Sequence, residues 1–150
     1  MNKKYSIGIG ILIILLLIFT VPKYFTGNVI ANTDTNSDIE KIEIIHFHRT
    51  NQCYSCITMG NLAEETINIY FQEELKSGKI TFQHLNGELP ENKDKTTKYG
   101  ATGSSLWIGT HHADGRFTKE ENTNVWYKIN DKQDYHDYLK GIIESKLSGE

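Results

Sequence analysis

The sequence predicts an α/β domain in which strands and helices follow in the order β-α-β-α-β-β-α. Two observations support this prediction. Cys53 and Cys56 are the only cysteines among 150 residues, and they form a CxxC motif between an apolar stretch and a long helical pattern. From residue 41 onward, segments of alternating and of helical periodicity succeed one another to the end of the chain.

An apolar run precedes this domain. Lys3 and Lys4 stand before it, and residues 7–21 contain no charged side chain. A bilayer core needs about 17–25 helical residues, which residues 5–24 supply when interfacial residues are included. We expect residues 1–25 to be an uncleaved transmembrane anchor with its lysines in the cytoplasm. The alternative is a signal peptide cleaved near Ala31, which would give a secreted protein.

The next segment, residues 26–40, is polar and predicts a linker. Residues 41–150 then form one small domain, which the predicted anchor places outside the cytoplasm at the cell membrane as a single-pass protein. The formal net charge is −3, and no basic stripe is present, so nucleic acid is not an expected partner.

The first half of the domain is predicted from its apolar periodicity. Residues 42–47 read as a buried strand. A helix follows from about residue 54 to residue 76, with Thr50 or Asn51 as its N-cap and Ser77-Gly78 at its end. Residues 79–85 alternate and predict a second strand.

The second half begins with a polar helix over residues 90–99 that stops at Gly100. Residues 105–109 predict a third strand, and the segment from His111 to Arg116 predicts a turn. A fourth strand is expected at 116–118 or at 124–128. The last helix covers residues 131–147, where apolar side chains recur at helical spacing.

This order, with CxxC at the first strand–helix junction, resembles the thioredoxin superfamily in its shorter, glutaredoxin-sized form. More closely, the segment HFHRTNQCYSC resembles the signature YFH-x-T-x-R-C-x-T-C of the ArsF-like, nitroreductase-associated thioredoxin-like family. Later matches are Asn86 with Asn92, and the stretch from Tyr99 to Leu106. Two positions depart from the signature: Gln52 replaces Arg and Ser55 replaces Thr.

The resemblance and the CxxC motif predict a thiol–disulfide oxidoreductase without a cofactor other than its own Cys53–Cys56 pair. A helix N-terminus stabilises a thiolate, so Cys53 is expected to attack and Cys56 to resolve. Tyr54 and Ser55 lie between the sulfurs and are expected to tune the redox potential. The expected partners of the protein are protein thiols or disulfides and a membrane electron carrier.

Two further positions belong to the predicted site. His48 is expected to tune the cysteines. Ser104 aligns with the cis-proline that most thioredoxins carry before the strand facing the CxxC. A non-proline cis bond costs about 2.5–4 kcal/mol, so a trans or rearranged peptide is expected there, and the substrate edge differs from that of thioredoxin.

Two other functions remain open. His46 and His48 share a strand face, and with Cys53 and Cys56 they spell His-x-His-x4-Cys-x2-Cys, a ligand set suited to zinc or copper. This would make the protein a metallochaperone or a metal sensor. We prefer the interpretation in which His46 is a core or half-exposed histidine with its hydrogen bonds satisfied, His48 tunes the cysteines, and no metal binds. The remaining alternative is a non-catalytic subunit of a membrane redox complex.

Overall fold

The computed structural model describes residues 38–149, so the predicted anchor over residues 5–24 lies outside the described residues. Within them, four strands form one mixed sheet in the order β2-β1-β3-β4. Strand β1 (Ile39–His48) runs parallel to β2 (Ile80–Asn86) and antiparallel to β3 (Ser105–His112). Strand β4 (Phe117–Glu121) pairs antiparallel with β3 at one edge.

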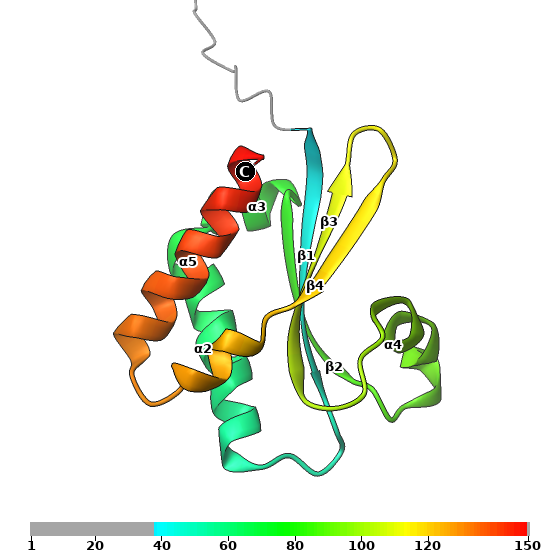
Figure 1. Cartoon of the computed structure of the whole chain (residues 1–150), viewed down its shortest axis with the longest axis vertical. Coiled ribbons are helices and arrows are strands. Elements are labelled where there is room, and N and C mark those ends of the chain that lie inside the picture. Colours follow the sequence, from blue (N-terminus) through cyan, green and yellow to red (C-terminus); the bar gives the residue numbers. More distant parts are fainter. Residues whose placement is uncertain (1–37, 150) are drawn as a thin grey trace, which may run out of the picture. The chain divides into compact units, whose positions relative to one another are not determined.

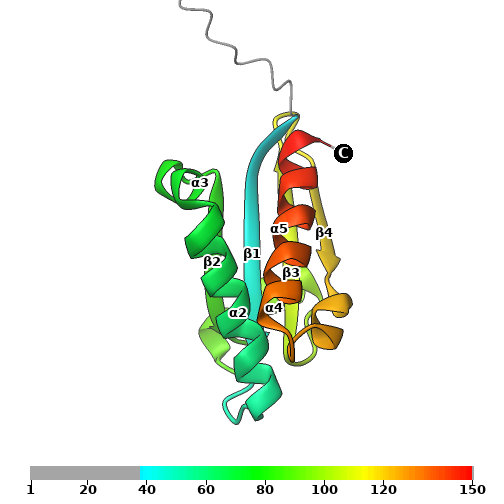
Figure 2. The ribbon, with the colours of Figure 1, turned by 90° about the vertical axis from the view of Figure 1, so that its left-hand side faces the viewer.

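Helices cover both faces of this sheet (Figures 1 and 2). α2 (Tyr54–Tyr70) and α5 (Lys132–Ser148) lie together on one face, and α4 (Lys93–Tyr99) covers the other. Three short helices complete the described part of the chain: α3 (Gln72–Ser77) and the 3-10 helices η2 (Pro90–Asn92) and η3 (Thr123–Tyr127). The element order and the mixed sheet confirm the predicted α/β class and the predicted order β-α-β-α-β-β-α.

The two faces have separate cores, because successive side chains of a strand point to opposite sides. Ile42 and Ile44 face α2 and α5 in the larger core, and both are fully buried. Ile45 and Phe47 face the smaller core under α4. The central strand β1 is therefore apolar on both faces, as its sequence predicts.

The helix predicted over residues 54–76 is two helices. The backbone leaves helical angles at Phe71 (φ −129°, ψ 37°), which separates α2 from α3. The physical reason is burial: the Phe71 side chain is only 3 % exposed and packs into the larger core. The predicted end is correct, because Gly78 adopts φ 78°, a left-handed conformation that suits glycine.

Strand β3 is longer than predicted. His111 and His112 belong to it, and the turn lies at residues 113–115, so the prediction of a turn at the two histidines was wrong. Pairing explains the difference, since β3 has partners along its whole length on β1 and β4. Of the two candidates for the fourth strand, the one starting near residue 116 is correct in position, whereas residues 123–127 form η3 and bury Val125.

The chain enters the sheet early, since β1 begins at Ile39, opposite His112 on β3. The end of the expected linker, residues 39 and 40, is thus part of the strand. Among residues 38–149, no helix combines the length and the apolar character that crossing a membrane requires.

Candidate functional site

The CxxC motif lies where three elements meet at one end of the sheet. β1 ends at His48, and a short loop leads from Arg49 to the start of α2. β3 starts at this same end, because it is antiparallel to β1 and Ser105 pairs with Phe47. Continuing this register by one residue places Ser104 opposite His48. The sequence-predicted positions around the cysteines are thereby collected at one edge of the domain.

Cys53 and Cys56 form a disulfide, with their Cα atoms 5.1 Å apart. Cys53 is also the N-cap of α2, and its sulfur accepts a hydrogen bond from the backbone N–H of Cys56 at 3.2 Å. The prediction of Thr50 or Asn51 as the cap was wrong. Thr50 is engaged elsewhere, since its backbone N–H donates to the Glu88 carboxylate at 3.0 Å.

The two cysteines differ in their exposure. Cys53 is exposed and Cys56 is half-buried. Beside them, Tyr54 is 84 % exposed and Ile57 is 44 % exposed, while Ser55 is half-buried. The first turn of α2 contains no acidic side chain, so nothing opposes the stabilisation of a thiolate by the helix N-terminus. An incoming reactant therefore meets Cys53 first.

His46 is the buried histidine of the site. It is 1 % exposed and lies on the face of β1 that α2 covers. Burial, reinforced by the neighbouring rings of His84 and His48, lowers the pKa of His46 to about 4. The ring is accordingly neutral at physiological pH.

A hydrogen-bond chain connects His46 to the protein surface. Its Nδ1 lies 2.9 Å from Nδ1 of His84, and Nε2 of His84 lies 3.2 Å from the Glu64 carboxylate. Because a carboxylate only accepts, Nε2 of His84 donates to Glu64. When His84 is neutral, its Nδ1 therefore accepts a hydrogen bond from Nδ1–H of His46. The other ring nitrogen of His46, Nε2, is then unprotonated and carries a lone pair. This buried Nε2 has no hydrogen-bond partner among the described residues.

The partners of this chain follow one row of α2. Cys56, Gly60 and Glu64 are four residues apart and therefore share a helix face. Gly60 lies over the His46 ring and Glu64 binds His84. Because the His46 ring lies at Gly60, it is about one helical turn from Cys56 toward the C-terminus of α2, roughly 5–6 Å along the helix axis.

His48 lies nearer to the end of β1 and shares the face of His46, as the alternation predicts. The two ring centroids are 5.6 Å apart. Nδ1 of His48 lies 3.0 Å from the carbonyl oxygen of Arg49, so this nitrogen is the protonated donor. The ring is thereby oriented by its own loop.

The alternative metal ligands, Cys53, Cys56, His46 and His48, are not arranged as a metal site in this oxidised form. Both sulfurs are in the disulfide, and Nδ1 of His46 is paired with His84. Over residues 38–149, no group of three or more His, Cys, Asp or Glu side chains has a geometry that could hold a metal ion.

Ser104 is half-buried and stands directly before β3. The peptide bonds of the described residues are all trans, including the bond that precedes Ser104. Its assignment to the substrate edge stays a prediction.

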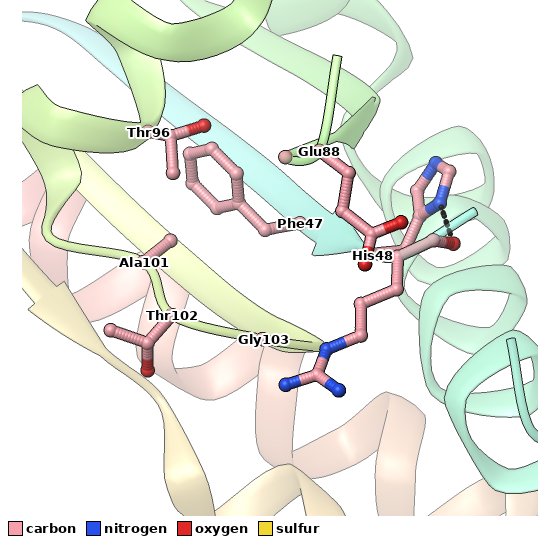
Figure 3. Close-up of a pocket in the computed structure, with 9 residues that line it drawn as sticks. Phe47, His48, Glu88, Thr96, Ala101, Thr102 and Gly103 are labelled. Carbon is pink, nitrogen blue, oxygen red and sulfur yellow. Dashed lines mark hydrogen bonds between the residues drawn. The ribbon is translucent and has the colours of Figure 1, made fainter. Parts of the chain in front are cut away.

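A pocket opens at this end of the sheet, and sequence reasoning did not find it (Figure 3). It has a volume of about 180 Å³ and lies between the end of β1, the loop after β2, α4 and the loop before β3. Arg49 and Glu88 are its charged residues. His84 and Glu64 were also missed. No spacing in the sequence could reveal the pocket or the two residues, because the segments that carry them are distant in the chain and meet only in the folded domain.

Comparisons with known proteins show similarity at the level of structure alone. No protein-family model matches the sequence, and no curated protein matches it. Among solved structures, the crystal structure of the Trx4 domain of ERdj5 is similar, with 13 % identity and a TM-score of 0.47 over 73 % of this chain and 85 % of that one. The zinc-bound form of human ERp44 has 15 % identity and a TM-score of 0.46, over 71 % of this chain and 27 % of that one.

Proposed function

We propose that this domain is a thiol–disulfide oxidoreductase that acts on polypeptides. The observation that carries the proposal is the Cys53–Cys56 disulfide at the N-terminus of α2, with Cys53 exposed and Cys56 half-buried. The Cys53 end of this disulfide is accessible from solvent, because Cys53 is exposed at the helix N-terminus. Cysteines in this position are reactive, whereas structural cysteines are buried and inert.

In the reducing direction the chemistry has two displacement steps. The Cys53 thiolate attacks one sulfur of a client disulfide, forming a mixed disulfide and releasing the other client sulfur as a thiolate. Cys56 then loses its proton and attacks the Cys53 sulfur, which releases the second client thiolate and closes the Cys53–Cys56 disulfide. The client gains two electrons and the dithiol loses two. The oxidising direction is the reverse.

The surface beside Cys53 supports a polypeptide as the client. Tyr54 and Ile57 present apolar side chains to solvent on the first turns of α2. Exposed aromatic and aliphatic groups next to a reactive group are typical of a contact surface for another chain.

Reduction of a protein disulfide, such as that of insulin, by the chemically reduced full chain tests this function. The expected result is catalysis that is lost in the variant with both Cys53→Ser and Cys56→Ser. Equal rates for the two proteins would show that the cysteines are not a redox site. Metal analysis of the reduced protein separates this function from metal binding.

Three finer statements belong to the same proposal. Residues 5–24 anchor the protein in the cell membrane and place the domain outside the cytoplasm. A membrane electron carrier resets the cysteine pair. The chain is a member of the ArsF-like, nitroreductase-associated group.

Mass spectrometry of the mature protein from its native membrane tests the anchor, since a new N-terminus near residue 32 would contradict it.

A further inference from the structure

The pocket beside the CxxC motif contains an arginine with no partner. Arg49 is exposed; its backbone carbonyl accepts from His48, but its guanidinium makes no hydrogen bond or ion pair with any other residue among 38–149. Its guanidinium lies over the loop before β3, since a Cβ placed on Gly103 would be 3.8 Å from it. The other arginine of the chain contrasts with it: Arg116 is paired with Asp38 at 2.8 Å and with Asp114 at 2.5 Å.

The acidic residue of the pocket does not satisfy this arginine. Hydrogen bonds from Thr50 lower the pKa of Glu88 and the positive charge of Arg49 contributes to this, but no ion pair of 4.0 Å or less joins the Glu88 and Arg49 side chains in the described part of the chain. The Glu88 carboxylate instead accepts the backbone N–H of Thr50 at 3.0 Å, and its own backbone N–H is bound by the side chain of Asn86. One oxygen of the Glu88 carboxylate is therefore held by the loop backbone, and no carboxylate of residues 38–149 lies directly on the Arg49 guanidinium.

The shape of the pocket suits one side chain. Phe47 and Ala101 give it an apolar wall, Thr96 closes it from α4, and Thr102 and Gly103 form its rim (Figure 3). A volume of about 180 Å³ accommodates a side chain and not a whole ligand of drug size. A carboxylate at the mouth of this pocket would meet the planar guanidinium, which binds carboxylates in a bidentate manner.

The pocket is within reach of the reactive sulfur. Three residues lie between Arg49 and Cys53, so their Cα atoms are at most about 14 Å apart. In an extended polypeptide, residues flanking a cysteine lie within a few residue rises of about 3.3 Å each. One client strand can therefore present its cysteine to Cys53 and a neighbouring side chain to the pocket.

We propose that this pocket is a specificity site for an acidic client side chain, Asp or Glu, close in sequence to the client cysteine, with Arg49 as the partner of its carboxylate. This inference rests on the proposed oxidoreductase function and specifies its substrates. A basic side chain is disfavoured at the guanidinium, because it would face the positive charge of Arg49.

Two synthetic peptides test this inference. Each has one cysteine in a mixed disulfide with uncharged 2-thiopyridine, and the three residues on each side of the cysteine are Glu in one peptide and Gln in the other. Attack of Cys53 on the peptide sulfur releases pyridine-2-thione, which is followed by its absorbance. The reduced full chain in detergent is expected to react about fivefold faster with the Glu peptide, and high salt should shrink the difference.

Arg49→Gln should lower the rate for the Glu peptide to that of the Gln peptide. Arg116→Gln is the matched control, because it removes the same charge at the other end of β3 and should keep the preference. No preference in the unaltered protein, or an equal preference in Arg49→Gln, would overturn the inference alone. Rates no faster than those of Cys53→Ser with either peptide would overturn the oxidoreductase function as well.

Discussion

The ring of His46 lies against the backbone of Gly60, with no room for any side chain between them. A Cβ on Gly60 would stand 2.2 Å from Nδ1 of His46, closer than such atoms approach in proteins. The glycine therefore permits α2 to pass over the histidine at the centre of the site. This contact links the packing of the helix to the hydrogen-bond chain from His46 to Glu64.

Gly60→Ala is expected to destabilise the domain by about 1–3 kcal/mol, because the buried ring must move to avoid the methyl group. This outcome is opposite to the usual effect, in which Ala in a helix interior is more stable than Gly by about 0.8–1 kcal/mol. The free energy of unfolding in urea measures it. Gly141→Ala in α5 is the control, since nothing lies within 4 Å of the new methyl group, and it should stabilise.

The neutral state of His46 predicts a pH dependence of stability. Its pKa is about 4 in the folded protein and 6.5 for an ordinary histidine, so the unfolded chain binds the proton more readily. This contribution to stability is complete above pH 6.5 and is lost as the pH falls from 6.5 to 4, by at most about 3 kcal/mol. His46→Gln should flatten the unfolding free energy over this range. An unchanged slope in the variant would assign it to other groups.

Glu43 holds α4 on the sheet. Its carboxylate accepts from the Tyr99 hydroxyl at 2.9 Å and from Nζ of Lys95 at 3.1 Å. Burial by itself raises the pKa of Glu43, but hydrogen bonds from His111, Lys95 and Tyr99 outweigh it and lower the pKa to about 2.

Glu43→Gln should therefore lower the free energy of unfolding by about 1–3 kcal/mol, because the charge-assisted hydrogen bonds are lost. Tyr99→Phe in the same background should add less than it does alone, since the two residues share one interaction. The exposed Glu121→Gln is the control and should stay within about 0.5 kcal/mol of the unaltered protein. Full additivity of the first pair would show that this hydrogen bond contributes little.

The unequal exposure of the two cysteines predicts unequal reactivity. In the reduced protein, iodoacetamide should modify Cys53 faster than Cys56, because Cys53 is exposed and caps the helix. Cys56→Ser should accumulate mixed disulfides with client proteins, whereas Cys53→Ser should accumulate none. Peptide mapping after brief alkylation and non-reducing gels measure both effects. Faster labelling of Cys56 would reverse the assigned roles.

Much of the fold could be predicted from the sequence, because local rules determine it. The alternation in β1 places apolar side chains on both faces, and this defines a central strand. Gly78 and Gly100 end their helices at the predicted positions, since both adopt a left-handed backbone that other residues avoid. The spacing of Cys53 and Cys56 at a strand–helix junction likewise predicted the disulfide site.

Other features depended on contacts that no local pattern encodes. Phe71 interrupts the long helix because the core accepts its side chain, and α2 begins after Cys53, whose sulfur accepts the backbone N–H of Cys56. The sequence by itself determined the strands, the helices and the place of the CxxC motif. Only the tertiary structure decided that His84 pairs with His46, which depends on the register of the parallel strands β1 and β2. It also decided that Arg49 borders a pocket, because segments distant in the chain form that pocket together.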